Sequence, residues 1–365
     1  MKRILWLIKG LGRGGAEQLL VNSALHRDRS RFEYEVAYLL PWKDALVPEL
    51  AEAGVPATCL RGARGPGWIP RLRGFVRERE FDVVHTHSPA VGAVAREALR
   101  RGPALISTEH NVWEQYHRAT YWANAITFPR NDFAIAVSAR VLGSIRYPKP
   151  LRGRRMPPLE TLYQGIDLQE TLRRAELDGV REELGIPAEA PVVGTIANFK
   201  PAKGHRYLLE AAASVLEEFP ETRFVLIGQG PLESEVRRSV QEAGLADRVL
   251  LTGFREDAIR LATCFDVYAA SSIYEGLSIA LLEVMGLGCP AVVTRAGGFP
   301  EVVADQENGL LVPTADASAL ANAIGDLLRD DERRAAIGRA ARERAADFDI
   351  RTTMARTEEI YGSLT

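Results

Sequence analysis

Residues 275–293, EGLSIALLEVMGLGCPAVV, hold the most informative pattern in the chain. An apolar segment of helical length is followed by a Gly-Cys-Pro break and a β-branched run, which is typical of a helix leading into a buried strand. Seven residues separate Glu275, before the helix, from Glu283, within it. Burying Glu283 without a partner is costly. A ligand with hydroxyl donors would satisfy it, whereas a salt bridge within the segment is disfavoured because no basic residue stands three or four positions away.

The same alternation of helix and strand extends over the whole chain. Strands rich in Val and Ile on both faces, separated by helices, indicate parallel sheets covered on both sides. The pattern runs twice in 365 residues, and about 150 residues per domain suggests two domains. The predicted fold class is therefore α/β, with two Rossmann-like, doubly wound domains facing across a cleft. The expected strands are residues 3–8, 34–40, 57–60, 82–87, 104–109 and 133–138, then 192–197, 223–227, 248–252, 267–270, 291–294 and 309–312.

The expected domain change lies near residues 168–190, which gives domains of residues 1–170 and 171–347. The last segment, 348–364, is long enough to pack back on the first domain. Residues 140–158 interrupt the alternation of strands and helices with four prolines. They contain six basic residues and no acidic one. We expect this stretch to form an exposed loop near the end of the first domain.

Composition and cysteine spacing give no sign of a membrane-spanning, exported or disulfide-linked protein. No uncharged apolar run approaches the ~18 residues of a membrane-spanning helix. The apolar core of the N-terminus, residues 4–8, is shorter than an export signal requires and is interpreted as the first strand. Cys59, Cys264 and Cys289 match no disulfide or metal spacing. These features predict a cytoplasmic protein.

Charge is distributed unevenly although the net charge is only −2. Residues 1–155 contain 25 Lys and Arg against 14 Asp and Glu, a balance of +11, and the remainder contains 21 against 34, a balance of −13. A basic first half suggests an anionic partner, such as a lipid surface, a lipid-phosphate acceptor or an acidic glycan. Nucleic acid is disfavoured because no binding motif accompanies the charge. A solvated, arginine-rich surface is the alternative.

In parallel α/β sheets, ligands bind beyond the carboxyl ends of the strands. The first such loop, residues 9–17, is glycine-rich, and Gly14 and Gly15 would let backbone N–H groups approach a phosphate at the start of a helix. It lacks the spacing of the dinucleotide fingerprint. A plain tight turn is the alternative interpretation.

Histidines stand at two further strand ends. His85 and His87 share one face of a strand, but no third metal ligand follows at a suitable spacing, so a lining or packing role is favoured over a metal site. His110 follows the strand at residues 104–109 and could hydrogen-bond a sugar hydroxyl. Its alternative role is structural.

In the second half, residues 194–205 place Asn198, Lys200 and Lys203 before a helix. Fixed positive charge beside a helix N-terminus suits a diphosphate. Surface lysines without a ligand are the alternative.

Taken in order, these motifs resemble glycosyltransferase family 4, whose members transfer sugars with retention and have the GT-B fold. The resemblance covers nearly the whole chain. It rests on the Glu-x7-Glu element and on LGRGGAEQLL, VVHTHSP, ISTEH, QGID, KPAKGHRYLLEA, VLLTGF, AGGFPEVV and ENGLLVP.

The resemblance implies roles for single residues. His110, Glu275 and Lys203 would be catalytic: His110 beside the donor sugar, Glu275 on the sugar hydroxyls and Lys203 on the diphosphate. The backbone of Gly276 and Leu277 would approach the sugar or its phosphate. The first domain would bind the acceptor and the second the donor.

The remaining donor contacts follow from the same resemblance. Glu283 would bind the ribose hydroxyls, the backbone near Phe254 would meet the base, and Gly14 and Gly15 would assist at the diphosphate.

One position departs from the family pattern. The family usually has an arginine five residues before its lysine, and that position here is Asn198, which carries no charge. Lys200 is the candidate substitute. Gln164 in place of asparagine is a milder change.

The resemblance therefore implies metal-independent, retaining transfer of a hexose-type sugar from a UDP or GDP donor to a glycan or lipid-linked acceptor, with no cofactor. A non-catalytic nucleotide-sugar-binding protein and a GT-B-fold epimerase are the alternatives.

Aromatic residues after His110, at 113, 116, 121 and 122, could receive a glycan or lipid, although core packing is the favoured use. With the basic loop they suggest peripheral contact with an anionic membrane.

Overall fold

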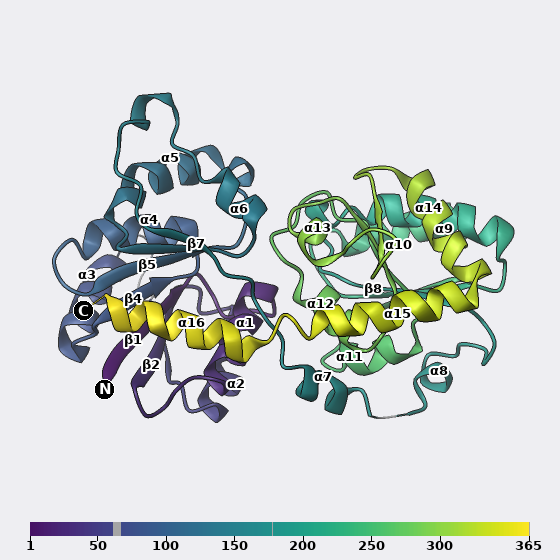
Figure 1. The fold of residues 1–365 in the computed structure, drawn as a ribbon, viewed down its shortest axis with the longest axis horizontal. Coiled ribbons are helices and arrows are strands. Elements are labelled where there is room, and N and C mark those ends of the chain that lie inside the picture. Colours follow the sequence, from purple (N-terminus) through teal and green to yellow (C-terminus); the bar gives the residue numbers. More distant parts are fainter. Residues whose placement is uncertain (61–66, 177, 365) are drawn as a thin grey trace. The chain divides into compact units, whose positions relative to one another are not determined.

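The computed structural model describes residues 1–60, 67–176 and 178–364. They form two compact units (Figure 1): unit 1 comprises Met1–Gly165 with Ile350–Thr365, and unit 2 comprises Ile166–Asp349. Each unit is built on one all-parallel sheet, as the sequence predicts. Among the described residues, no helix combines the length and the apolar character needed to cross a bilayer.

Unit 1 has seven strands in the order β3-β2-β1-β4-β5-β6-β7. The strands are β1 (Lys2–Ile8), β2 (Phe32–Tyr38), β3 (Ala57–Cys59), β4 (Val83–Thr86), β5 (Ala104–Glu109), β6 (Phe133–Ala136) and β7 (Leu159–Thr161). The helices are α1 (Gly15–Leu25), α2 (Val47–Glu52), α3 (Trp68–Arg79), α4 (Pro89–Ala98), α5 (Arg118–Thr127), α6 (Ala139–Ser144) and α16 (Ile350–Ser363), with 3-10 turns at Trp113–Gln115, Phe128–Arg130 and Lys149–Leu151. The prediction lacked β7, a three-residue strand at the sheet edge.

Strand β1 shows why both faces of this sheet are covered. Ile4, Trp6 and Ile8 belong to a core cluster with residues of α1 and α16, whereas Leu5 and Leu7 pack with residues of α3 and α4. Successive side chains of a strand point to opposite faces, so an apolar run such as this one requires helices on both. Figure 1 shows α16, the last helix of the chain, beside the first strand.

Unit 2 has six strands in the order β10-β9-β8-β11-β12-β13. They are β8 (Val192–Ile196), β9 (Arg223–Ile227), β10 (Val249–Gly253), β11 (Val267–Ala270), β12 (Ala291–Thr294) and β13 (Leu310–Val312). The helices are α7 (Leu168–Arg174), α8 (Val180–Glu183), α9 (His205–Glu218), α10 (Glu233–Glu242), α11 (Ala258–Leu261), α12 (Ile279–Gly286), α13 (Phe299–Val302), α14 (Ala317–Arg329) and α15 (Asp331–Ala345), with 3-10 turns at Pro201–Lys203 and Ala262–Cys264. Chain order reverses at β8, so the loop after β8 lies at a topological switch point, where ligands of such sheets bind.

A buried arginine ties α4 to α5 in unit 1. Arg96 is only 1% exposed. Its guanidinium donates hydrogen bonds to the side-chain oxygens of Asn124, Thr127 (3.1 Å) and Asn131 (3.4 Å). Burial lowers the pKa of Arg96 to about 10, so the group stays charged at neutral pH.

A buried carboxylate, Glu109, lies in the same region, at the end of β5. It accepts hydrogen bonds from Trp113 Nε1 (2.9 Å), Tyr116 Oη (2.8 Å) and Asn124 Nδ2 (3.3 Å). Burial raises its pKa, and the charge of Arg96 opposes that rise. The favoured core role of the aromatic residues is therefore confirmed for Trp113, which is fully buried, but is wrong for Trp122, which is 39% exposed.

We expect Arg96→Ala to lower the free energy of unfolding of unit 1 by about 3 kcal/mol, because three oxygens lose their donor in the protein interior. All five tryptophans of the chain lie in unit 1, so urea unfolding followed by tryptophan fluorescence reports on this unit. The control is Arg100→Ala, which removes an exposed pair with Glu97 and should cost less than about 0.5 kcal/mol. Equal losses in the two variants would contradict a stabilising role for the buried network.

Candidate functional site

Three loops meet at the carboxyl edge of the unit 2 sheet: residues 197–204 after β8, 271–278 after β11 and 295–298 after β12. Two glycines permit their close approach. A Cβ on Gly204 would lie 2.2 Å from the carbonyl oxygen of Ser271, and one on Gly297 would lie 1.6 Å from that of Glu275. Both have positive φ, +62° and +51°, which favours glycine. The backbones of these loops therefore contact one another directly.

The predicted catalytic residues of unit 2 are brought together by this arrangement. Lys203 Nζ forms an ion pair with Glu275, and their side chains are only 22% and 12% exposed. Ser272 Oγ lies 3.4 Å from the same carboxylate, and Ser271 Oγ donates to the carbonyl of Lys203 at 3.0 Å. The N–H of Ile273 donates to the carbonyl of Ala202 at 2.7 Å, which fixes the two loops in register.

A small pocket lies against this pair. Besides Lys203 and Glu275, its lining includes the hydroxyls of Thr195, Tyr268, Ser271, Ser272 and Ser278. A cation, a carboxylate and several hydroxyls around one small cavity can bind a phosphorylated, hydroxyl-rich ligand.

Further predicted donor-binding residues lie in the same unit, whereas Gly14 and Gly15 lie in unit 1. Gly276 and Leu277 are buried directly after Glu275. Asn198 is half-buried after β8, and Lys200 is exposed. Lys200 forms no ion pair with any described residue, so its charge is available to a ligand. Phe254, 38% exposed, follows β10.

Glu283 has a partner that differs from the one expected from the sequence. Its carboxylate pairs with Arg174 on α7 at 3.1 Å, across 109 positions of the chain. Burial raises the pKa of Glu283, and Arg174 opposes the rise. The ion-pair alternative is thus realised by a residue outside the segment, and the inference that Glu283 needs a ligand as its partner is wrong. Binding of ribose by Glu283 stays a prediction.

In unit 1, the predicted phosphate loop leads into α1. Gly14 has extended backbone and precedes the first helical residue, Gly15, and no side chain caps this helix. The Glu17 carboxylate lies close to Gly14, since a Cβ there would be 2.5 Å from its oxygen. Phosphate binding by the loop stays a prediction.

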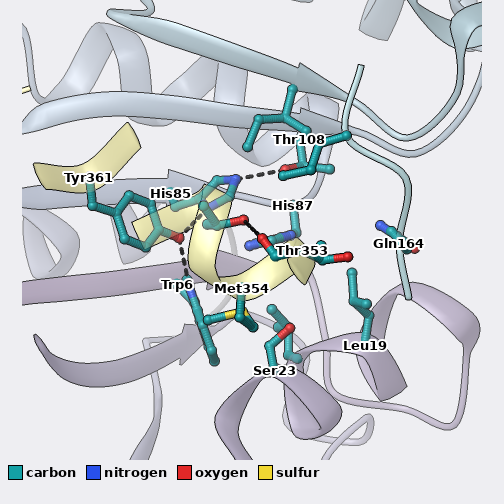
Figure 2. Close-up of a pocket in the computed structure, with 14 residues that line it drawn as sticks. Trp6, Leu19, Ser23, His85, His87, Thr108, Gln164, Thr353, Met354 and Tyr361 are labelled. Carbon is teal, nitrogen blue, oxygen red and sulfur yellow. Dashed lines mark hydrogen bonds between the residues drawn. The ribbon is translucent and has the colours of Figure 1, made fainter. Parts of the chain in front are cut away.

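Three histidines line up at the carboxyl ends of β4 and β5. His85 uses both ring nitrogens: Nδ1 lies 2.5 Å from Tyr361 Oη, and Nε2 lies 2.7 Å from Thr108 Oγ1. Trp6 Nε1 donates to the same Tyr361 hydroxyl at 3.0 Å (Figure 2). The favoured lining or packing role of His85 is supported, because both ring nitrogens contact side chains of the protein and the ring lines a pocket. No group of three or more His, Cys, Asp or Glu side chains suited to a metal occurs among residues 1–60, 67–176 and 178–364.

His110 is oriented by Gln164. Gln164 Nε2 donates to His110 Nδ1 at 3.0 Å, which places the His110 proton on Nε2, 3.4 Å from His87 Nδ1. His87 then carries its proton on Nε2, a buried nitrogen with no hydrogen-bond partner in the described part of the chain. Burial lowers the pKa of His85 to about 3, that of His110 to about 4 and that of His87 well below its ordinary value. All three are neutral at pH 7.

Comparison with known proteins agrees with this geometry. The model described as Glycosyltransferase Family 4 matches residues 7–170, and the model described as Glycosyl transferases group 1 matches residues 178–344. A D-inositol 3-phosphate glycosyltransferase of Saccharomonospora viridis is 30% identical over 316 residues, which are 80% of this chain and 72% of that protein. The chain belongs to glycosyltransferase family 4.

Two other proteins are similar to this chain. The crystal structure of Anabaena Alr3699/HepE in complex with UDP and glucose has a TM-score of 0.87, with 24% identity and full coverage of both chains. The predicted GT-B fold is thereby confirmed. An Escherichia coli UDP-Gal:alpha-D-GlcNAc-diphosphoundecaprenol alpha-1,3-galactosyltransferase is 24% identical over 274 residues, 69% of this chain and 68% of that protein.

The structure shows two partners of the predicted site residues that the sequence did not predict. Arg174 and Gln164 hold Glu283 and His110 through contacts distant in sequence. No local pattern signals Arg174, which is one of two adjacent arginines. The sequence shows Gln164 as a change from the usual asparagine, but it does not predict the contact with His110.

The stability of unit 1 should fall as the pH is lowered from 7 to 5. Unfolded histidines titrate near 6.5, whereas folded His85 and His110 titrate near 3 and 4. The stabilisation is therefore complete above pH 6.5 and is lost as the pH falls toward 4, by up to about 1.4 kcal/mol per pH unit for each histidine. Urea unfolding at pH 7.5, 6 and 5 measures the slope. His85→Asn should flatten it and the exposed control His117→Asn should not; an unchanged slope in His85→Asn would contradict the assignment.

Proposed function

We propose that the protein is a retaining glycosyltransferase that moves a hexose-type sugar from a UDP or GDP donor to a glycan or lipid-linked acceptor. The observation that carries the proposal is the Lys203–Glu275 pair at the switch point of the unit 2 sheet. It offers a cation to a diphosphate and a carboxylate to sugar hydroxyls in one small cavity. Unit 2 would bind the donor and unit 1 the acceptor.

The two charges can serve the reaction by exchanging partners. Without donor, Glu275 neutralises Lys203. A bound diphosphate, which carries more charge than a carboxylate, would draw Lys203 away and leave Glu275 free to accept hydrogen bonds from the sugar. As the bond between sugar and phosphate breaks, negative charge grows on the diphosphate. Lys203, Lys200 and the N-terminus of α9 would stabilise it without a metal ion.

His110 would act beside the donor sugar as a neutral group. Burial lowers its pKa to about 4, so the imidazole carries no charge that would oppose a sugar developing positive charge. Gln164 fixes the direction of its ring. Retention at the anomeric carbon is included in the proposal because the Glu-x7-Glu element resembles that of retaining enzymes.

The relatives favour a particular order of tests. The Anabaena structure contains UDP, and the Escherichia coli relative is named for a UDP-Gal donor and a diphosphoundecaprenol-linked acceptor. We therefore propose UDP before GDP, and a lipid-linked acceptor before a free glycan. Asn198 favours a second candidate function, a non-catalytic nucleotide-sugar-binding protein, because the loop lacks one of the usual charges.

A thermal-shift screen with UDP, GDP, ADP and their sugar conjugates, with and without chelator, tests the donor class. A ligand at 100 times its dissociation constant stabilises by about 2.7 kcal/mol, which is readily detected. Product analysis by NMR then distinguishes retention from inversion. Binding without transfer or donor hydrolysis would support the non-catalytic alternative.

Lys203→Ala should lower kcat at least about 100-fold, because the leaving diphosphate loses a preorganised cation. The matched control is Lys200→Ala, an exposed lysine in the same loop, for which we expect a loss of about tenfold or less. Steady-state kinetics on both variants, with thermal unfolding to confirm that they are folded, makes the comparison. Near-native turnover in Lys203→Ala would refute this role.

Glu283→Gln should weaken binding of the bare nucleoside diphosphate by roughly tenfold to 100-fold, the range for losing hydrogen bonds to a charged group. The 2′,3′-dideoxy nucleotide serves as control, because it cannot bond to the carboxylate and should bind the variant and the native protein alike. Titration calorimetry measures both ligands. If the two nucleotides lose affinity equally, Glu283 supports the site only through its pair with Arg174.

A further inference from the structure

Helix α5 of unit 1 exposes large apolar side chains to solvent. Trp122 and Ile126, one helical turn apart, are 39% and 42% exposed. Arg118 stands one turn earlier on the same face and is also exposed. The opposite side of the helix is buried through Asn124 and Ala125.

The basic segment between α6 and β7 lies against this helix. Arg154 donates to the backbone carbonyl of Ile126 at 2.5 Å, and Tyr121 Oη donates to the carbonyl of Arg146 at 3.3 Å. Tyr147 Oη donates to the carbonyl of Arg155 at 2.9 Å. The prediction of an exposed loop over residues 140–158 is confirmed in part: residues 152–156 are exposed, but residues 140–144 belong to α6, and Ile145 and Tyr147 are buried. The bonds bring the charges of the segment beside the apolar side chains of α5, in the part of unit 1 where Figure 1 labels α5 and α6.

We define the docking surface by its exposed members, which are Arg118, Trp122, Ile126, Arg146, Lys149, Arg152, Arg154, Arg155 and Met156. Its charge is strongly positive. Residues 114–160 contain eight Lys and Arg and three acidic residues, Glu114, Asp132 and Glu160. The Asp132 carboxylate accepts a hydrogen bond from the backbone of Leu105, and Glu160 pairs with Arg356. None of the six cations on this surface forms an ion pair with any described residue. Elsewhere arginines such as Arg255 and Arg329 are paired.

We infer that this surface docks unit 1 on a lipid bilayer rich in anionic headgroups. Lys and Arg close to such a membrane each contribute about fivefold in affinity. Trp and aliphatic side chains on the same face insert at the boundary between headgroups and acyl chains. A soluble polyanion would account for the cations but not for the exposed Trp122, Ile126 and Met156. The inference goes beyond the proposed function, because lipid binding does not require sugar transfer.

Cosedimentation of the full chain with vesicles tests the inference. We expect binding to vesicles of 70% phosphatidylcholine and 30% phosphatidylglycerol, little binding to pure phosphatidylcholine, and a decrease between 50 and 500 mM salt. Equal binding to both vesicle types, or no binding to either, would overturn it.

Variants locate the surface. Removing two cations should cost roughly 30-fold, so Arg152→Glu with Arg155→Glu should reduce vesicle affinity at least that much. Trp122→Ala with Ile126→Ala should reduce it at least about tenfold. The control reverses two exposed arginines of α15, Arg339→Glu with Arg342→Glu, and should bind like the native protein.

Binding of UDP and binding of heparin show whether the proposed function or the proposed membrane docking fails. UDP binding is measured on every variant, so loss of vesicle binding with native UDP binding supports docking at this surface, whatever the outcome for transfer. Heparin binding is measured in parallel. If the Trp122 and Ile126 variant binds vesicles like the native protein, or if heparin is bound and anionic vesicles are not, the surface recognises a soluble polyanion and the inference is overturned.

Discussion

The ion pair between Lys203 and Glu275 depends on the contact of loop backbones at the edge of the unit 2 sheet. Neither residue could hold its position if Gly204 or Gly297 carried a side chain, because a Cβ at either place would overlap a carbonyl oxygen of the neighbouring loop. The carboxylate is only 12% exposed, so it would be costly to leave without a partner.

The three histidines at the strand ends of unit 1 are, by contrast, held in the uncharged form by burial. His85, His87 and His110 lie close together, with ring centroids 4.2 Å and 5.6 Å apart along the series. Three imidazolium ions could not share this space, and burial keeps all of them neutral. Their orientation comes from hydroxyl and amide partners, above all Tyr361 and Gln164. The longer side chain of Gln164, where asparagine is usual, reaches the His110 ring.

Periodicity was sufficient to predict the two parallel sheets and the order of the loops, because strand and helix patterns are local. It was insufficient for β7, whose three residues give too short a pattern. Partners distant in sequence were also missed: Arg174 reaches Glu283 through the packing of α7 and α12, which depends on the folded unit. Trp113 and Trp122 lie in the same aromatic cluster, yet one is fully buried and the other exposed. Local composition does not decide which side of a short helix faces the core.

The charged groups around the loop after β8 bear on whether a diphosphate could bind there although Asn198 is uncharged. Glu275 cancels Lys203, and His205 at the start of α9 is neutral because burial lowers its pKa to about 4. Lys200, which is exposed and forms no ion pair with any described residue, would therefore offer positive charge to an arriving diphosphate, as would the exposed Arg206 at the start of α9. The 14-residue helix α9 adds the partial charge of its N-terminus. An arginine at position 198 would add one fixed positive charge, so its absence should weaken stabilisation of the leaving group while leaving the exchange between Lys203 and Glu275 intact.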